Sequence, residues 1–262
     1  MSTLLVAGID VGSLSAEVVI MDRRQMISYL IMPTGANSKV AAERVMQAAL
    51  EQTALKLDEL KFIIATGYGR FNIPFAHKQV TEITCHGRGA YFLNPDARTV
   101  IDIGGQDSKV IRLSEQGHVL DFVMNEKCAA GTGRFLEVMA QALEVKLEGL
   151  ADLSGSAQRS VPISSMCTVF AESEVVSLIA QGLPREEIAR GLHDAIAERT
   201  AGLVYRIGLK EKVVMTGGVA KNSAVLRALE EKLKVKIDLP PEPQIVGALG
   251  AAILAGEEIN RA

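Results

Sequence analysis

The sequence predicts an α/β fold divided into two lobes, and three observations support this. Apolar segments of β-strand character alternate with segments of helical periodicity. One strand–turn–strand segment recurs later in the chain. A length of 262 residues is long for one compact core and suits two small lobes. We expect the first lobe to span residues 1–98 and the second 99–243, with a last helix in 244–262 that packs back on the first lobe.

Each element is predicted from a local pattern. Residues 4–22 have the pattern of a strand, a tight turn and a second strand. Residues 38–57 have helical periodicity. Residues 60–69 are typical of a buried strand that ends in a glycine turn, and residues 98–125 supply further strands. The rest of the chain alternates helices with one clear strand, KVVMTGG at 212–218.

Composition excludes several classes of protein. Apolar residues make up 48%, charged residues 23%, and the net charge is −3, so we expect an ordinary soluble protein without a nucleic-acid surface. The N-terminal residues lack the basic start and long apolar middle of a signal peptide. The longest apolar run, 246–256, is too short to span a bilayer. Three cysteines, at 85, 128 and 167, make no disulfide framework, which favours the reducing cytoplasm.

An internal repeat relates two aspartates. Residues 9–20 align with 101–112 at an offset of 92, so that Asp10 matches Asp102. Two unrelated hairpins are the alternative, because Asp and Gly are common in turns. In both copies, however, the aspartate lies at the end of an apolar strand, where an unpaired charge is costly. We therefore expect both carboxylates to hold Mg²⁺, directly or through water.

Glycine turns follow both aspartates. At Gly12 and Gly104 the turn exposes backbone N–H groups with no Cβ in the way, and such groups bind phosphate oxygens. Two hairpins of this kind that face each other could hold a polyphosphate between two lobes. A third glycine turn, in 213–222, would let the backbone approach adenosine before a helix that starts at Asn222 or Ser223. A plain strand-to-helix turn is the alternative there. The chain has neither a P-loop motif nor a strand–GxGxxG–helix unit.

These motifs resemble those of a known family. GIDVGS, DIGGQDSK and TGGVAKN together resemble the nucleotide-binding signatures of actin, sugar kinases, acetate kinase and the heat-shock chaperone ATPase. TGYGR, TEITCHGRGA, NEKCAAGTGRFLE, CTVFAESEVVSLIAQG and PEPQIVGALGAA are similar to segments of the activator component of 2-hydroxyacyl-CoA dehydratases, which is grouped with the ATPase subunits of benzoyl-CoA reductases. The resemblance implies two ribonuclease-H-like lobes, an actin-like ATPase fold, with ATP in the cleft. It also implies a homodimer with one 4Fe–4S cluster on its two-fold axis, ligated by Cys128 and Cys167 of each subunit.

The two cysteines suit that role physically. They lie 39 residues apart, outside any CxxC pair. A 4Fe–4S cluster takes four thiolates, and a two-fold axis doubles two thiolates to four. Each cysteine precedes a predicted helix, the first with Thr132 as a candidate cap, so the positive helix end would lower the thiol pKa. A buried apolar role is the alternative for any free cysteine, and it is the interpretation we prefer for Cys85. His86 beside it suggests zinc, but no second ligand pair with suitable spacing is present.

The resulting hypothesis is an ATP-dependent activator. A ferredoxin or flavodoxin would reduce the cluster, and ATP hydrolysis would drive an electron into a separate 2-hydroxyacyl-CoA dehydratase or related reductase. Gln106 or Asp107 would orient the attacking water. Lys109 is a weaker candidate for phosphate binding, because strand alternation could point it to solvent. The other candidates for binding ATP or its Mg²⁺ are Asp10, Gly12, Ser13, Asp102, Gly104, Gly105, Gly131, Gly133, Gly217, Gly218 and Asn222.

Two hypotheses of other classes remain open. A small-molecule kinase of the sugar-kinase type would share the nucleotide loops, but the chain is short for that and its cysteine segments would have no task. A nucleotide-gated interaction protein without a redox role, as among chaperone and actin relatives, would bind ATP and a partner but no iron. In none of the three do we expect nucleic acid or a membrane as partner.

Overall fold

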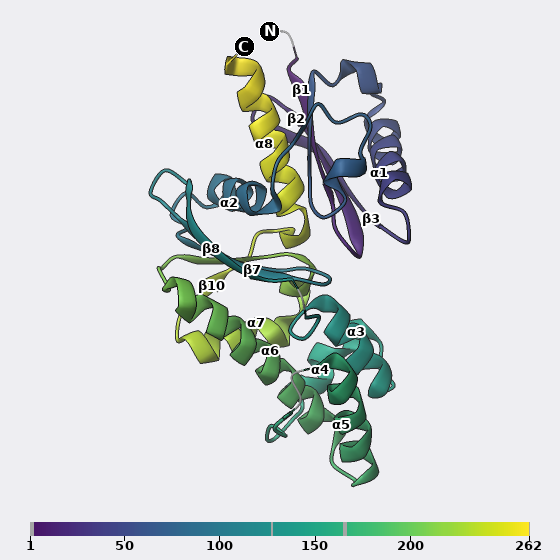
Figure 1. Cartoon of the computed structure of the whole chain (residues 1–262), viewed down its shortest axis with the longest axis vertical. Helices are drawn as coiled ribbons and strands as arrows, with labels where there is room; N and C mark the ends of the chain where they lie inside the picture. The colour runs from purple at the N-terminus through teal and green to yellow at the C-terminus, as the bar shows by residue number, and fades with distance from the viewer. Residues whose placement is uncertain (1–2, 127, 165–166, 262) are drawn as a thin grey trace.

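The structure, a computed structural model, describes residues 3–126, 128–164 and 167–261. Within these residues, ten strands form two five-stranded sheets, with orders β3-β2-β1-β4-β5 and β10-β9-β6-β7-β8. The first sheet lies in the upper half of Figure 1 and the second near its middle. The strands are β1 (Leu5–Val11), β2 (Ser15–Asp22), β3 (Gln25–Pro33), β4 (Phe62–Thr66), β5 (Lys78–Gln79), β6 (Thr99–Ile103), β7 (Ser108–Leu113), β8 (Val119–Asn125), β9 (Val213–Thr216) and β10 (Ile237–Asp238).

The α-helices of the described residues lie against these sheets and beyond the second one (Figure 1). They are α1 (Ser38–Thr53), α2 (Glu82–Leu93), α3 (Gly133–Ala142), α4 (Leu150–Gly155), α5 (Thr168–Ala180), α6 (Arg185–Ile207), α7 (Ser223–Leu233) and α8 (Val246–Arg261). Short 3-10 turns are η1 (Leu57–Glu59), η2 (Arg70–Asn72), η3 (Leu147–Gly149), η4 (Gly218–Lys221) and η5 (Pro243–Ile245). No helix of the described part is long and apolar enough to cross a membrane.

The two sheets share one plan. In each, the first strand pairs antiparallel with the next strand along the chain and parallel with a later one: β1 with β2 and β4, and β6 with β7 and β9. The register places Asp10 opposite Glu17 and Asp102 opposite Lys109. Both members of each pair are related by the offset of 92, so the predicted repeat corresponds to two equivalent hairpins.

Helices α2 and α8 pack against each other between the two sheets (Figure 1). Glycines allow this close approach, because a Cβ at Gly89 would overlap the backbone of Val246 and one at Gly250 would overlap the backbone of Cys85. Helix α8 covers one face of the first sheet, whereas α2 joins the hydrophobic cluster under the second sheet. Helix α2 therefore covers the sheet that follows it in the chain. The boundary near Arg98 remains a prediction.

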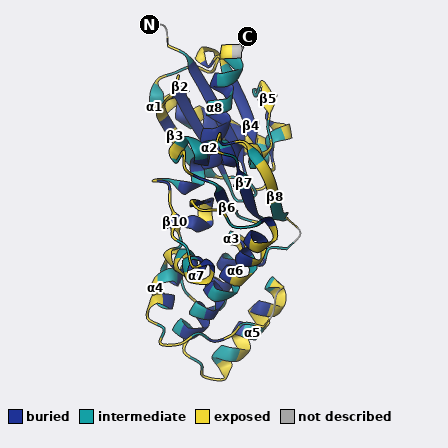
Figure 2. Ribbon diagram, turned by 90° about the vertical axis from the view of Figure 1, so that its left-hand side faces the viewer, coloured by how far each residue is buried: buried dark blue, intermediate teal, exposed yellow. Residues whose placement is uncertain are grey.

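The core of the second lobe continues into the helices beyond its sheet. One apolar face of α3, continued by its C-cap residue, is buried in this core: Phe135, Leu136, Met139 and Leu143. Helix α5, near the bottom of Figures 1 and 2, is much more exposed, and its buried residues are Ala171 and Val175. Just after its end, Gly182 lies in the left-handed region at φ +81°, a conformation that commonly terminates helices.

Two local predictions need correction. The helix predicted over 38–57 ends at Thr53, because Ala54 adopts a left-handed conformation that closes it. Its start is sharp, since the Asn37 side chain accepts hydrogen bonds from Lys39 N and Val40 N. Strand β3, the edge strand of the first sheet, was not predicted as a separate element. The first five residues of this edge strand are mostly exposed, and an edge strand with little buried surface needs no strict alternation of apolar and polar residues. The sequence therefore has no clear strand pattern there.

Candidate functional site

A cavity of about 810 Å³ is lined by the ends of strands from both sheets. It brings together most of the residues predicted to bind nucleotide or metal: Asp10, Gly12, Ser13, Asp102, Gly104, Gly105, Gln106, Asp107, Lys109, Gly133, Gly217, Gly218 and Asn222. Gly131 and the two candidate cluster cysteines are absent from its described lining. Thus residues from four separate segments converge, although their roles in binding stay predictions.

The two glycine turns both line this cavity and lie in contact with each other. A Cβ at Gly105 would lie 2.6 Å from Leu14 Cγ and 2.9 Å from Ser13 Oγ, so the second turn touches the first. Gly12 N donates to Ser15 O at 2.9 Å, and Gly104 N donates to Asp107 O at 3.0 Å. Because these two N–H groups close their own turns, phosphate oxygens would be bound by the N–H groups that follow them.

Asp10 and Asp102 lie at the ends of β1 and β6, on either side of the buried His86. The distance from His86 Nε2 to Asp10 Oδ2 is 3.7 Å, and from His86 Nδ1 to Asp102 Oδ1 it is 3.3 Å. Burial alone would lower the pKa of His86, but the carboxylates of Asp102 and Asp10 raise it above its ordinary value. Sequence reasoning considered His86 only for zinc. The described residues contain no group of three or more His, Cys, Asp or Glu that could hold a metal.

Lys109 is buried, and the expectation that it could point to solvent is wrong. Its Nζ lies 3.2 Å from Asp102 Oδ2 and 2.9 Å from Asp107 Oδ2. Burial would lower the pKa of Lys109, yet these two carboxylates raise it. For the acidic Asp102, burial has the opposite effect and would raise the pKa. His86 and Lys109 outweigh this and hold the pKa of Asp102 below its usual range. The second hairpin thus presents a compensated cluster of opposite charges.

The first hairpin has a different chemistry at the same place. Glu17 occupies the position equivalent to Lys109. Its pKa is raised to about 8, mainly by burial and to a smaller extent by the negative charge of the neighbouring Asp10. Gln244 Nε2 donates to Glu17 Oε1 at 3.1 Å and to Ser15 Oγ at 2.9 Å. Sequence reasoning missed both residues. The signal for Glu17 was a charged residue at the repeat position of Lys109, between apolar strand neighbours.

Asn222 holds the third glycine turn in place. As predicted, α7 follows it, and the Asn222 Oδ1 accepts hydrogen bonds from Ala224 N and Val225 N. Its Nδ2 lies 3.2 Å from the Nε2 of His193, a buried residue that sequence reasoning left without a role. Burial lowers the pKa of His193 to about 4, so this ring is neutral at pH 7.

This environment predicts an acid-sensitive step in stability. The pKa of His193 is about 4 in the folded chain and 6.5 when exposed. The unfolded chain therefore binds more protons between these values, and stability falls as the pH falls through this window, by roughly 2 kcal/mol down to pH 5. His193→Gln keeps a hydrogen-bond acceptor for Asn222 but does not titrate. We expect urea unfolding at pH 7 and pH 5 to show a smaller loss for the variant. An equal loss in both proteins would contradict this role of His193.

The segment that carries Cys128 is bonded directly to the second glycine turn. Gly133 N donates to Gly104 O at 2.9 Å, and Arg134 N donates to Gly105 O at 2.8 Å. The prediction that both thiols lie at helix N-termini is correct for Cys167, which is the N-cap residue of α5. It is wrong for Cys128, because a turn closed by Thr132 N and Ala129 O precedes α3. Thr132 is the N-cap residue of α3, as predicted, but its hydroxyl donates to Ala129 O and makes no capping hydrogen bond to the helix.

The cysteines differ in exposure. Cys128 is half-buried against the core of the second lobe, and Cys167 is exposed. Cys85 is fully buried, which agrees with the core role preferred for it, and burial raises its pKa to about 12.

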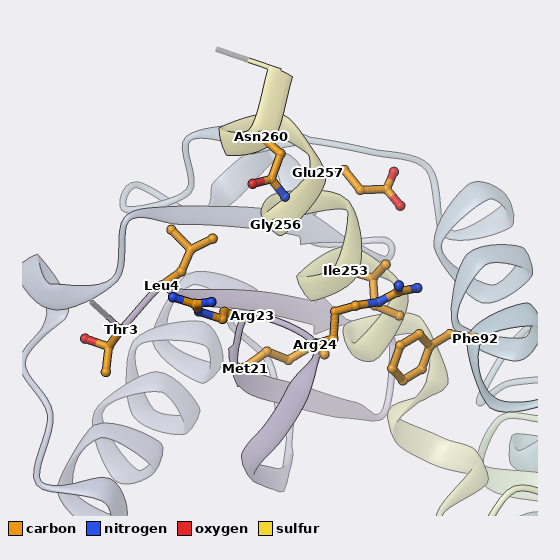
Figure 3. A pocket seen from close by; sticks show the side chains of 10 residues that line it. All are labelled: Thr3, Leu4, Met21, Arg23, Arg24, Phe92, Ile253, Gly256, Glu257 and Asn260. Carbon is orange, nitrogen blue, oxygen red and sulfur yellow. The ribbon is translucent and has the colours of Figure 1, made fainter. Parts of the chain in front are cut away.

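A second cavity, of about 660 Å³, lies beside the C-terminal half of α8 (Figure 3). Its described lining includes Arg24, Phe92 and Ile253 but none of the predicted site residues.

Comparison with known proteins gives consistent matches over nearly the whole chain. The sequence model of the BadF/BadG/BcrA/BcrD ATPase family matches residues 7–255. The activator of lactoyl-CoA dehydratase from Anaerotignum propionicum is 51% identical over 97% of this chain and 98% of its own length. A benzoyl-CoA reductase subunit from Thauera aromatica is 34% identical over 81% of this chain and 77% of its own length.

Solved structures agree. Component A of the Acidaminococcus fermentans (R)-2-hydroxyglutaryl-CoA dehydratase has a TM-score of 0.94 and 44% identity, covering 98% of this chain and 99% of that one. The Clostridium difficile activator of 2-hydroxyisocaproyl-CoA dehydratase with bound ADPNP has a TM-score of 0.93 and 43% identity, covering 98% and 96%. A ROK family glucokinase from Streptomyces griseus, at a TM-score of 0.59 and 14% identity, shares the fold alone. The predicted α/β fold of the actin and sugar-kinase type is confirmed.

Proposed function

This chain belongs to the BadF/BadG/BcrA/BcrD ATPase family, and on that premise we propose that it is an ATP-dependent activator of a CoA-thioester dehydratase or related reductase. It would hydrolyse ATP and pass one low-potential electron to that separate enzyme. The observation that carries this proposal is the pair of hydrogen bonds from Gly133 and Arg134 to the second glycine turn. They join the nucleotide cavity to the segment that carries Cys128.

The cavity suits Mg²⁺–ATP. Asp10 and Asp102 supply two carboxylates at strand ends, where they would hold the metal through water. The N–H groups of Ser13 and Gly105, which follow the N–H groups that close the turns, would bind phosphate oxygens. Gly217, Gly218 and Asn222 would flank adenosine. Gly131 lies outside the cavity lining, so a direct contact of that residue with the nucleotide is no longer part of the proposal.

Hydrolysis needs a positioned water, and two residues of the second turn are candidates. Asp107 lines the cavity, and Lys109 holds its carboxylate at 2.9 Å. Gln106 also lines the cavity and is exposed, so its amide is accessible. Either side chain would orient the attacking water, which is the positioning task that phosphoryl transfer requires.

The cysteines fit a 4Fe–4S cluster shared by two copies of the chain. Such a cluster takes four thiolates, and each chain offers an exposed Cys167 and a half-buried Cys128 at the starts of neighbouring segments of one lobe. Helix α5 places the positive end of its dipole at Cys167, which favours a thiolate there. When bound, the cluster supplies an electron of low potential.

The surface next to Cys167 supports a homodimer. Val169, Phe170 and Val176 of α5 are 66%, 68% and 54% exposed, and Figure 2 shows this helix largely in the colour of exposed residues. A second copy of the chain would cover these apolar side chains and bring its own two thiols to the same place. The cytoplasm would provide the reducing setting, with ferredoxin or flavodoxin as electron donor.

Anaerobic purification tests the proposal. We expect a brown protein with about four irons and four sulfides per dimer, whose electron transfer to a CoA-thioester dehydratase requires ATP hydrolysis. A colourless, iron-free protein that transfers the γ-phosphate of ATP to a sugar would overturn it in favour of a kinase. An iron-free protein with slow ATP turnover and partner-dependent release would instead favour a nucleotide-gated interaction protein.

A further inference from the structure

Gln244 lies in η5, the turn between the second sheet and α8, and its backbone neighbours are attached to the third glycine turn. Gly217 N donates to Pro243 O at 3.0 Å. The Lys221 Nζ lies 2.9 Å from Glu242 Oε1. Gln244 therefore has a fixed position relative to the loop that would flank adenosine.

The side chain of Gln244 reaches across the cavity to the first hairpin. Its Nε2 donates to Ser15 Oγ at 2.9 Å and to Glu17 Oε1 at 3.1 Å. A carboxamide nitrogen has two N–H donors, so these two hydrogen bonds use both. The backbone carbonyl of Ser15, rather than its hydroxyl, accepts from Gly12 N, and that hydrogen bond closes the first glycine turn. One side chain thus connects the proposed adenosine loop with the proposed phosphate turn of the other sheet.

The second hairpin uses a different device at the equivalent place. There, Lys109 forms ion pairs with Asp102 and Asp107 from its own sheet. The first hairpin has Glu17 instead of a lysine, and its polar partner comes from a segment 227 residues away. Thr34 holds the first turn to its own sheet through its hydroxyl, which donates to Gly12 O, and its N–H, which donates to Leu14 O. Gln244 adds the contact that sets this turn relative to the other side of the cavity.

We propose that Gln244 is a positioning residue that holds the first phosphate turn in register with the adenosine loop, so that one ATP molecule can contact both. This rests on the proposed function, in which ATP occupies the cavity. Without these hydrogen bonds, ATP binding itself would have to bring the first turn into register with the adenosine loop, and affinity would fall. Gln244 would contact no reacting atom, so the turnover of bound ATP would change little.

Gln244→Glu tests this in the whole chain of 262 residues. The substitution removes both donors and places a second carboxylate against Glu17. We expect the Kd and the KM for ATP to rise about tenfold, with kcat within about twofold of the original chain. The exchange variant Glu17→Gln/Gln244→Glu restores a donor opposite an acceptor. We expect it to recover ATP affinity to within about threefold.

The controls separate this role from a general one. Gln52→Glu adds the same charge on the exposed face of α1 and should leave ATP binding unchanged. Should the Gln244→Glu chain fail to fold, Gln244→Met keeps the bulk without the donors and should show the same tenfold loss. Unaltered ATP binding in either variant, or an exchange variant no better than Gln244→Glu, would overturn the proposal. Those outcomes concern Gln244 alone and leave the proposed function standing. If the original chain itself bound no ATP, the proposed function would be wrong, and the role of Gln244 with it.

Discussion

Replacing Cys128 with alanine is expected to remove the iron of the proposed homodimer and to leave ATP binding intact. One Cys167 from each chain would remain, and two thiolates do not hold a 4Fe–4S cluster. ATP binding should persist because Cys128 is not among the described lining of the cavity. The hydrogen bonds to the second glycine turn come from the backbone of Gly133 and Arg134, which the substitution does not change. Iron and sulfide per dimer should fall from about four to near zero, with the Kd for ATP unchanged.

Two further cysteine variants provide controls for that measurement. Cys167→Ala should lose iron in the same way, because it removes the other thiol of the set. Cys85→Ala should keep its iron, since Cys85 is fully buried and burial keeps its thiol protonated, with a pKa of about 12. Full iron content in the Cys128 variant would refute the assignment, and loss of iron from the Cys85 variant would point to a different ligand set.

The nucleotide hairpins could be predicted from the sequence because the relevant pattern is local. Asp10 and Asp102 each lie at the end of an apolar strand before a glycine turn, and strand sterics place such residues at one edge of a sheet. The repeat then made the two hairpins equivalent. The α/β class followed from the same strands and from helical periodicity in between.

The residues that connect the two sides of the cavity could not be predicted in this way. His86 comes from α2, yet it lies against carboxylates from both sheets. Gln244 meets Glu17 across 227 residues of sequence. Such contacts depend on how α2 and α8 pack together, and short-range periodicity carries no information on that packing. The start of α3 at Thr132 was predicted correctly, but Cys128 does not lie at it, because the hydrogen bond of Thr132 to Ala129 forms a turn between the cysteine and the helix.

The charge difference between the two hairpins predicts that equivalent aspartates differ in their effect on stability. Asp102 is 2% exposed and lies beside two basic side chains, His86 and Lys109. Asp102→Asn leaves the buried Lys109 ammonium and the neighbouring imidazole with less negative charge, which we expect to lower the free energy of unfolding by about 3 kcal/mol. Asp10 faces Glu17. The pKa of Glu17 is raised to about 8, first by burial and second by Asp10. Because Glu17 with this pKa is largely protonated at pH 7, Asp10→Asn removes little repulsion. It mainly weakens the contact with His86, so its cost should stay below about 1 kcal/mol.

Both variants should nevertheless lose ATP hydrolysis, by about 100-fold in kcat, because each removes a carboxylate proposed to hold Mg²⁺. Urea unfolding of the nucleotide-free proteins would measure the first effect and steady-state ATP turnover the second. Asp96→Asn removes the same charge from an exposed turn and should change neither.

Equal destabilisation by the two site variants would show that the contrast between Glu17 and Lys109 does not determine stability. If one variant kept full turnover, its carboxylate would not hold the metal. The expected result, similar losses of turnover with unequal losses of stability, follows from two hairpins that share a plan but differ in the residue opposite the aspartate.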